Sequence, residues 1–195
     1  MFDDIAPNCF MTCFGIMGHY KDFKMRNHRD VLKRRVVEPL SDLTYPMGFF
    51  DGAAQGQPRG VGCRILFSQQ HSYNVWMGIE DSTNKFSELV VVWTCLFWAN
   101  HKGIRDIQIF VDSRVVIDWL NLKLEIHSIY LQQWCMRIKE LLLLFTGTSF
   151  RHIFRENNME VDRLSKHGLG CEMGLLHFAE LSGTSVTRTN RVHIF

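Results

Sequence analysis

The sequence predicts an α/β domain built on a mixed sheet, and two features of the chain lead to that fold class. Three apolar segments separated by turn residues lie within 48–78, a pattern typical of an antiparallel meander of strands. Beyond residue 84, segments of helical period alternate with short apolar runs, as expected where crossover helices join parallel strands. Apolar residues make up 46% of the 195-residue chain, which is enough to bury a core.

The elements are expected in the order β-β-β-α-β-α-α-β-α. The first helix has the clearest signal, because apolar side chains from Phe86 to Phe97 recur every three or four residues and Gly103 provides a stop. Ser113 can cap the next helix, and Gly147 is expected to end the long one after it. The predicted strands cover 48–53, 61–68, 73–78, 107–111 and 149–154, and the predicted helices cover 85–102, 114–122, 128–145 and 158–167.

This pattern divides the chain into three parts. Residues 47–169 form the predicted domain, and residues 1–46 form an extension of different composition. The extension carries seven Lys or Arg residues between positions 21 and 35, which either grip a phosphate backbone or belong to a solvated helix or linker. Residues 170–195 are expected to form a tail, and its polar part from 182 onward is expected to be frayed.

Composition limits the compartment and the partners. The net charge is only +2, so attraction to a nucleic acid has to come from local patches. The six cysteines show no disulfide-framework spacing, which favours a reducing intracellular compartment, either nucleus or cytoplasm. No stretch approaches the ~18 apolar residues of a membrane helix, and the start of the chain lacks the basic region of a signal peptide.

Four acidic residues occupy positions that suit a metal centre: Asp51, Glu88, Asp112 and Asp162. Two of them lie at the ends of predicted strands and two lie in the first turns of predicted helices. Hard divalent cations prefer carboxylate oxygens, and two such ions can stabilise the attacking and leaving oxygens of a phosphodiester. Each acid also has an ordinary explanation, since it can form a turn, favour a helix dipole or pair with a nearby base. Those explanations treat the four acids separately and do not account for their common placement.

Several short segments around these acids recur together in a known family. They are Phe50-Asp51-Gly52-Ala53, Thr83-Asn84 with Glu88, Val111-Asp112-Ser113, His152 ten residues before Asp162, and the Asn158 to Asp162 spacing. In this order they resemble the ribonuclease H type 1 family, and in particular the reverse-transcriptase-like branch carried by plant retroelements. The resemblance implies a ribonuclease H-like fold, with a five-stranded mixed sheet (an antiparallel meander plus parallel strands) flanked by helices. It also implies a divalent-metal endonuclease that cuts the RNA strand of an RNA–DNA hybrid.

The resemblance implies roles for the acids and for one histidine. Asp51, Glu88 and Asp112 would hold one Mg²⁺ ion, and Asp51 with Asp162 would hold a second, with Mn²⁺ as the alternative metal. His152 would assist proton transfer or product release, a task that suits an imidazole near neutral pH. A half-buried histidine without a catalytic task is the alternative at that position.

Substrate contacts are implied at five further positions. In the family, residues matching Thr83 and Asn84 contact a DNA phosphate and the minor groove, although loop and helix-cap roles explain them equally well. Asn158 belongs to the family's Asn-x-x-x-Asp spacing and is expected at the substrate. Lys85 and Arg114 depart from the family pattern, where Asn and Gln are common, and their added positive charge favours phosphate contacts over groove reading by neutral amides.

Two other functions remain open at this point. A domesticated retroelement fragment would bind nucleic acid or a protein without cutting, and the departures at Lys85 and Arg114 together with the unusual extension favour it. The complete set of four acids opposes it. A related metal nuclease that cuts DNA is the third possibility, and the Thr83-Asn84 pair opposes that one.

Overall fold

The structure is a computed structural model, and it describes residues 44–53, 59–80, 83–121 and 123–194. The predicted extension therefore lies outside the described residues, apart from 44–46. In the described part of the chain, no helix is long and apolar enough to cross a membrane. The strands and helices are β1 Met47–Ala53, β2 Arg59–Leu66, β3 His71–Ile79, α2 Asn84–His101, β4 Asp106–Val111, α3 Arg114–Leu120, α4 Ile129–Leu142, β5 Gly147–His152, α5 Met159–His167, β6 Leu175–Ser182 and β7 Ser185–His193.

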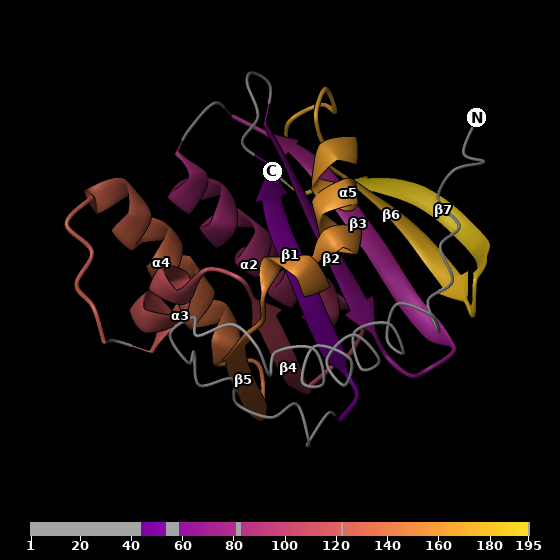
Figure 1. Ribbon diagram of the computed structural model, residues 1–195, viewed down its shortest axis with the longest axis horizontal. Helices are drawn as coiled ribbons and strands as arrows, with labels where there is room; N and C mark the ends of the chain where they lie inside the picture. The colour runs from indigo at the N-terminus through magenta and orange to yellow at the C-terminus, as the bar shows by residue number, and fades with distance from the viewer. Residues whose placement is uncertain (1–43, 54–58, 81–82, 122, 195) are drawn as a thin grey trace, which may run out of the picture.

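A mixed sheet forms the centre of the fold (Figure 1), with the strand order β5-β4-β1-β2-β3-β6-β7. The strands β1, β4 and β5 are parallel neighbours, whereas all other neighbouring strands pair antiparallel. The predicted α/β class, with a meander followed by helical crossovers, is therefore confirmed.

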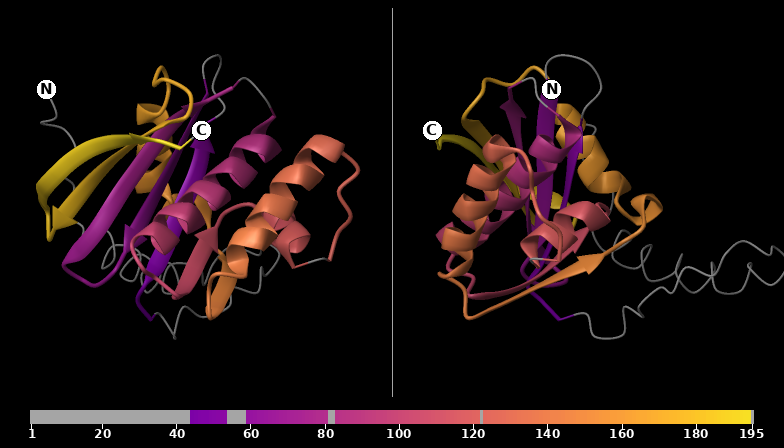
Figure 2. Two further views of the ribbon diagram at one scale, coloured as in Figure 1. Left: turned by 180° about the vertical axis from the view of Figure 1, so that it is seen from behind. Right: turned by 90° about the vertical axis from the view of Figure 1, so that its left-hand side faces the viewer.

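Helices cover both faces of the sheet, as the edge-on view in Figure 2 shows. On one face, α2 packs against β1 and β2, and α4 packs on the outside of α2. The larger apolar cluster, which includes Phe50, Leu89 and Trp98, fills this side. On the other face, α5 packs across β1, β2 and β3 over a smaller cluster that includes Trp76 and Leu164.

The ends of α2 follow from the residues that flank it. The Thr83 hydroxyl accepts a hydrogen bond from the Phe86 backbone N–H at 3.3 Å, which caps the start of the helix. At the other end, Gly103 adopts a φ of 80°, which a residue with a side chain rarely takes, and its N–H donates to the Asn100 carbonyl. The predicted stop at Gly103 is confirmed.

The predicted sheet of five strands is wrong, because the described residues form seven. Residues 175–193, predicted to belong to a tail that frays after 182, instead form β6 and β7, which extend the sheet from β3. The apolar residues of β6 are buried on both faces of the sheet, so they do not alternate with polar ones. Every residue of β7 is exposed, so its sequence lacks the buried face that makes a strand recognisable.

Most other predicted elements agree with the structure to within two residues. The long helix is the exception, because α4 ends at Leu142 rather than at 145. Gly147 does not end that helix but opens β5, where it pairs with Asp106 of β4. Ser113 stands at the cap position of α3 as predicted, yet its side chain makes no capping hydrogen bond.

Two glycines allow the helices to approach the sheet where the acids lie. A Cβ on Gly52 of β1 would stand 2.8 Å from the Cβ of Ser87, in the turn of α2 that carries Glu88. A Cβ on Gly62 of β2 would collide with the backbone of Leu164 and Ser165 in α5, the helix that carries Asp162. Glycine at both positions therefore brings two of the acids close to β1.

We expect Gly62→Ala to destabilise the protein by about 1–3 kcal/mol, the usual cost of overpacking a tight contact. The colliding atoms are backbone atoms, so α5 has to move away from the sheet and carry Asp162 with it. Thermal unfolding measures the first effect, and any catalytic activity should fall together with it. An unchanged melting temperature would show that α5 does not depend on this contact.

Candidate active site

The four acids meet at the end of the sheet where the parallel strands β1 and β4 terminate. Asp51 lies in β1, and Asp112 directly follows β4, the parallel neighbour of β1. Glu88 in the second turn of α2 and Asp162 in the first turn of α5 approach from opposite faces. Asp51 is close enough to Asp112 and Asp162 for their charges to act on it, and Glu88 is close enough to Asp112. The structure therefore brings together all four acids named from the sequence.

Asp51 is the most perturbed acid of the group. Its pKa is raised from 3.8 to about 7, mainly by burial and then by repulsion from Asp112 and Asp162. The positive charge of Arg155 and the hydrogen bond that the Gly52 backbone N–H donates act in the opposite direction. Near neutral pH, Asp51 therefore keeps its proton unless another cation replaces that proton.

Glu88 is oriented by a serine that sequence reasoning assigned only to a helix cap. Burial raises the pKa of Glu88, and the negative charge of Asp112 adds to this shift. A hydrogen bond with the Ser113 side chain and the positive charge of Lys85 favour the ionised form instead. Ser113 follows Asp112 directly, so one short segment supplies both an acid and the partner of another acid.

Asp112 lies between groups of opposite sign. Burial raises its pKa, and Asp162 contributes in the same direction. A hydrogen bond from its own backbone N–H and the positive charges of Arg155 and His152 lower the pKa. Arg155, in the short 3₁₀ helix Arg155–Asn157, thus acts on both Asp51 and Asp112. No motif marks this arginine in the sequence, and its role emerges only when α5 docks beside β1.

Asp162 has a cationic partner within its own helix. The Nζ atom of Lys166, one turn further along α5, lies 2.6 Å from its Oδ2 atom, and both side chains are partly exposed. The sequence already allowed this pairing as the ordinary explanation of Asp162. Because the pair is at the surface, it contributes only a few tenths of a kcal/mol, about 0.3–0.5 for such helical pairs, and a competing cation can separate it.

The donor set suits a hard divalent cation, although the side chains are not closed around one. Among the residues that the structure describes, no three His, Cys, Asp or Glu side chains stand close enough together to hold an ion as placed. Carboxylates are the preferred ligands of such ions, and the repulsion that raises the pKa of Asp51 is what a bound cation would remove. The donor set therefore fits a divalent cation in its chemistry.

His152 stands at the rim of this cluster. It is the last residue of β5, opposite Val111 of β4, and its side chain is exposed. Its Nε2 atom lies 3.2 Å from the backbone oxygen of Asp112, and its ring contacts Phe154 edge-on. The imidazole is therefore both next to the acids and open to solvent.

Asn158 is buried, which does not suit the predicted contact with a substrate. Its Nδ2 atom donates a hydrogen bond to the Phe50 carbonyl at 2.8 Å, and only 3% of the residue is exposed. Since Phe50 precedes Asp51 and Asn158 precedes α5, this bond ties the start of the helix to β1. We therefore assign Asn158 a positioning role, which accounts for its fixed spacing from Asp162.

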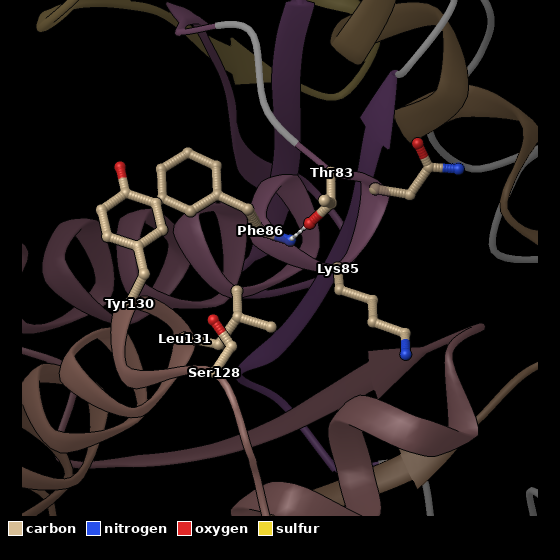
Figure 3. A pocket seen from close by; sticks show the side chains of 7 residues that line it. Thr83, Lys85, Phe86, Ser128, Tyr130 and Leu131 are labelled. Atoms are coloured by element: carbon tan, nitrogen blue, oxygen red, sulfur yellow. Dashed lines mark hydrogen bonds between the residues drawn. The ribbon is translucent and has the colours of Figure 1, made fainter.

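A shallow pocket opens beside the acids between the starts of α2 and α4 (Figure 3). On the α4 side, the exposed ring of Tyr130 stacks on Phe86 with 5.0 Å between the ring centres. Asn84 accepts a hydrogen bond from the Arg59 guanidinium at 3.1 Å. The lining residues are Thr83, Asn84, Lys85, Phe86, Ser128, Tyr130 and Leu131.

The two basic departures from the family pattern are both exposed. The Nζ atom of Lys85 lies 5.5 Å from the ring centre of Trp119 in α3. Lys85 lines the pocket and is also close enough to Glu88 for its charge to act on that acid. Arg114 is the first residue of α3, directly after the segment with Asp112. Their placement leaves the expected phosphate contacts sterically open.

Comparisons with known proteins agree with this architecture. A family model described as reverse transcriptase-like matches residues 49–168. Among solved structures, RNase H1 from the halophilic archaeon Halobacterium salinarum is 25% identical with a TM-score of 0.58, and the match covers 63% of this chain and 96% of that one. LC11-RNase H1, solved in complex with an RNA/DNA hybrid, is 19% identical with a TM-score of 0.59 and coverages of 63% and 95%. A search of curated proteins found no match.

The sheet order and the acids at its edge define a domain of the ribonuclease H-like class. The chain belongs to the reverse transcriptase-like family, because the family match spans more than half of it. The resemblance to the ribonuclease H type 1 family is confirmed by this match and by the solved structures of similar fold.

Proposed function

We propose that this protein is a divalent-metal-dependent endonuclease that hydrolyses the RNA strand of RNA–DNA hybrids. The observation that carries the proposal is the meeting of Asp51, Glu88, Asp112 and Asp162 at one sheet edge, with the pKa of Asp51 raised to about 7. A bound cation would remove the repulsion that raises this pKa. The similar fold of LC11-RNase H1, which was solved with an RNA/DNA hybrid, supports the choice of substrate.

Mg²⁺ is the cofactor that suits the proposal, and Mn²⁺ is its substitute. Asp51, Glu88 and Asp112 would hold one ion, and Asp51 with Asp162 would hold the other. Two such ions stabilise the attacking and leaving oxygens of a phosphodiester, so the products would carry a 5′-phosphate and a 3′-hydroxyl. Asp162 can leave its ion pair with Lys166 to hold this second ion, because the pair is partly exposed.

The remaining residues of the site would move a proton and hold the two strands. His152 is exposed beside Asp112 and can take up or release a proton at Nε2. Thr83, Lys85 and Tyr130 line the pocket on which the DNA strand would lie, with Lys85 available to a phosphate. The RNA strand would then pass the acids, where its 2′-hydroxyl distinguishes it from DNA.

A binding module without nuclease activity is the second candidate. Two cations of the chain already act on the acids, because Lys166 pairs with Asp162 and Arg155 lies close to Asp51 and Asp112. These contacts offset part of the negative charge without a metal. A domesticated retroelement fragment that binds nucleic acid but does not cut would look like this.

A panel of labelled substrates separates the two candidates. RNA–DNA hybrid, double-stranded RNA and duplex DNA are incubated with the full chain, each in Mg²⁺ and in EDTA. The proposed nuclease degrades only the hybrid, and only in Mg²⁺. The binding module leaves all three substrates intact while it retards the hybrid in a gel.

We expect His152→Ala to slow turnover by several-fold to about a hundredfold, and not to abolish it. Positioned acid–base groups contribute at least about 10², but an auxiliary group at the rim can be replaced in part by water. His101, also exposed but at the far end of α2 from Glu88, provides the matched control as His101→Ala, which should cleave normally. A loss in His152→Ala as complete as in an acid variant would mean that His152 holds the site together.

A further inference from the structure

The strands β6 and β7 form a surface that the proposed chemistry does not use. Both lie beyond the family match, which ends at residue 168. β7 is the edge strand of the sheet at the side opposite β5 (Figure 1). Every residue in β7 is exposed. Its sequence, Ser-Val-Thr-Arg-Thr-Asn-Arg-Val-His, contains arginine, histidine, hydroxyl and amide side chains but no acid.

On the face of the sheet that α5 covers, these strands continue a line of basic residues. Trp76 of β3, His177 of β6 and Arg191 of β7 stand directly opposite one another in the strand register. The ring of His177 stacks on Trp76 at 5.9 Å between centres, with 15° between planes, and His167 at the end of α5 lies 6.3 Å from Trp76. We call His167, His177 and Arg191 the basic row. It runs from the end of α5 to the edge of the sheet. Burial and the charge of Arg191 lower the pKa of His177, so Arg191 rather than His177 carries a positive charge at neutral pH.

The opposite face of the same strands carries an acid, Glu180. Arg188 of β7 stands opposite Glu180 of β6. Glu180 accepts a hydrogen bond from the Tyr73 hydroxyl at 2.6 Å and lies 2.9 Å from the His71 ring. Lys102 is held over the rings of Tyr73, Trp98 and Phe178 at 4.7–5.5 Å. Arg188 therefore stands opposite an acid and Arg191 stands opposite a histidine, so the two arginines of β7 differ in environment.

The charge of the edge strand identifies the kind of partner. A second copy pairing antiparallel along β7 would bring the arginines of both copies together without any acid between them, and such like-charge juxtaposition is unfavourable. An anionic partner fits better. Arginine, histidine, hydroxyl and amide side chains together with exposed backbone N–H groups are the usual contacts to nucleic-acid phosphates. An acidic polypeptide would match only the charge of this strand and not its hydroxyl, amide and backbone N–H groups.

We propose that the basic row and the adjoining edge of β7 bind the sugar–phosphate backbone of the nucleic acid beyond the cleavage site. The choice of an RNA–DNA hybrid as this nucleic acid rests on the proposed function. The geometry suits an extended footprint, because α5 carries Asp162 in its first turn and His167 at its end. A duplex lying on the acids can therefore reach the row along the helix.

Two arginine variants test this surface. Arg191→Ala removes the exposed charge of the basic row, and Arg188→Ala removes an exposed charge from the same strand on the other face. Binding of a labelled RNA–DNA hybrid of about 30 base pairs to the full chain is measured in EDTA over a series of KCl concentrations. We expect Arg191→Ala to weaken binding about three- to tenfold and to reduce the slope of log affinity against log salt by about 1, whereas Arg188→Ala changes neither.

Three results would overturn the inference. Equal losses in both variants would mean that β7 acts only through its general charge, and no loss in either would mean that the edge strand does not touch the hybrid. The third result is that Arg191→Ala binds polyglutamate more weakly than the wild type does but binds the hybrid equally well. This result would identify an acidic protein as the partner. The proposed function is tested separately by cleavage in Mg²⁺. If the wild type cleaves but Arg191→Ala binds normally, only the inference about this surface fails. If the wild type binds through this surface but does not cleave, only the proposed function fails.

Discussion

Asp51→Asn should abolish cleavage and, in the absence of metal, make the protein more stable at pH 8. The aspartate lies among other acids, and its pKa is raised to about 7, so above that pH the fold carries a buried charge that opposes it. Asparagine keeps the shape of the side chain and removes the charge. The variant also loses a carboxylate oxygen that would hold Mg²⁺, so the chemistry should stop.

The pH dependence of stability provides the measurement. Below pH 3.8 the acid is protonated in both states, and between 3.8 and about 7 only the folded state holds the proton. Stability should therefore fall as the pH rises through this window, by an amount on the order of 4 kcal/mol, and stay low above it. Asp51→Asn should remove most of this fall and raise the melting temperature at pH 8 in EDTA by about 5 °C or more.

Asp106→Asn is the matched control for this experiment, because Asp106 is exposed at the opposite end of β4. It should leave both the cleavage rate and the pH profile unchanged. A lower melting temperature for Asp51→Asn at pH 8 would contradict the assignment of Asp51 as the repelled acid of the cluster.

The second large effect is expected in Asp112→Asn, which should lose cleavage while it keeps the fold and the affinity for the hybrid. Asp112 lies at the end of β4, half-buried between Glu88 and Arg155, so its exchange removes a proposed metal ligand and leaves the proposed nucleic-acid surface unchanged. Cleavage and gel retardation are measured on the same preparation.

Asp118→Asn is the control for that variant, since Asp118 lies in α3 soon after Asp112 but takes no part in the cluster. It should cleave at the rate of the wild type. Equal activity of Asp112→Asn and wild type in saturating Mg²⁺ would remove Asp112 from the site.

The parts of the fold that sequence reasoning anticipated are those with a buried face. The helix α2 and the strands β1 to β4 carry regular apolar patterns, and their acids lie at the ends of those patterns, so both the elements and the meeting of Asp51, Glu88 and Asp112 could be expected. Asp162 joined them through its spacing from His152 and from Asn158, and the structure explains the second spacing by the bond from Asn158 to the Phe50 carbonyl.

The missed features depend on contacts between distant segments or on exposed residues. β7 has no buried residue and β6 has no alternation, so neither shows a strand period. Arg155 acts on Asp51 and Asp112 only because α5 docks on glycine positions of β2. Ser113 lies at a cap position, and only the fold reveals that its side chain bonds to Glu88 instead. Local patterns carry no information about such contacts.

Strand-resolved cleavage measures whether the four acids hold divalent cations that cut the RNA strand of a hybrid. A hybrid labelled on the RNA strand and, in a second preparation, on the DNA strand is incubated with wild type and with Asp112→Asn over a range of Mg²⁺ concentrations. We predict that wild type shortens only the labelled RNA, in proportion to bound Mg²⁺, and that Asp112→Asn shortens neither strand. A wild-type protein that binds the hybrid tightly and leaves both strands intact at every Mg²⁺ and Mn²⁺ concentration would contradict the account.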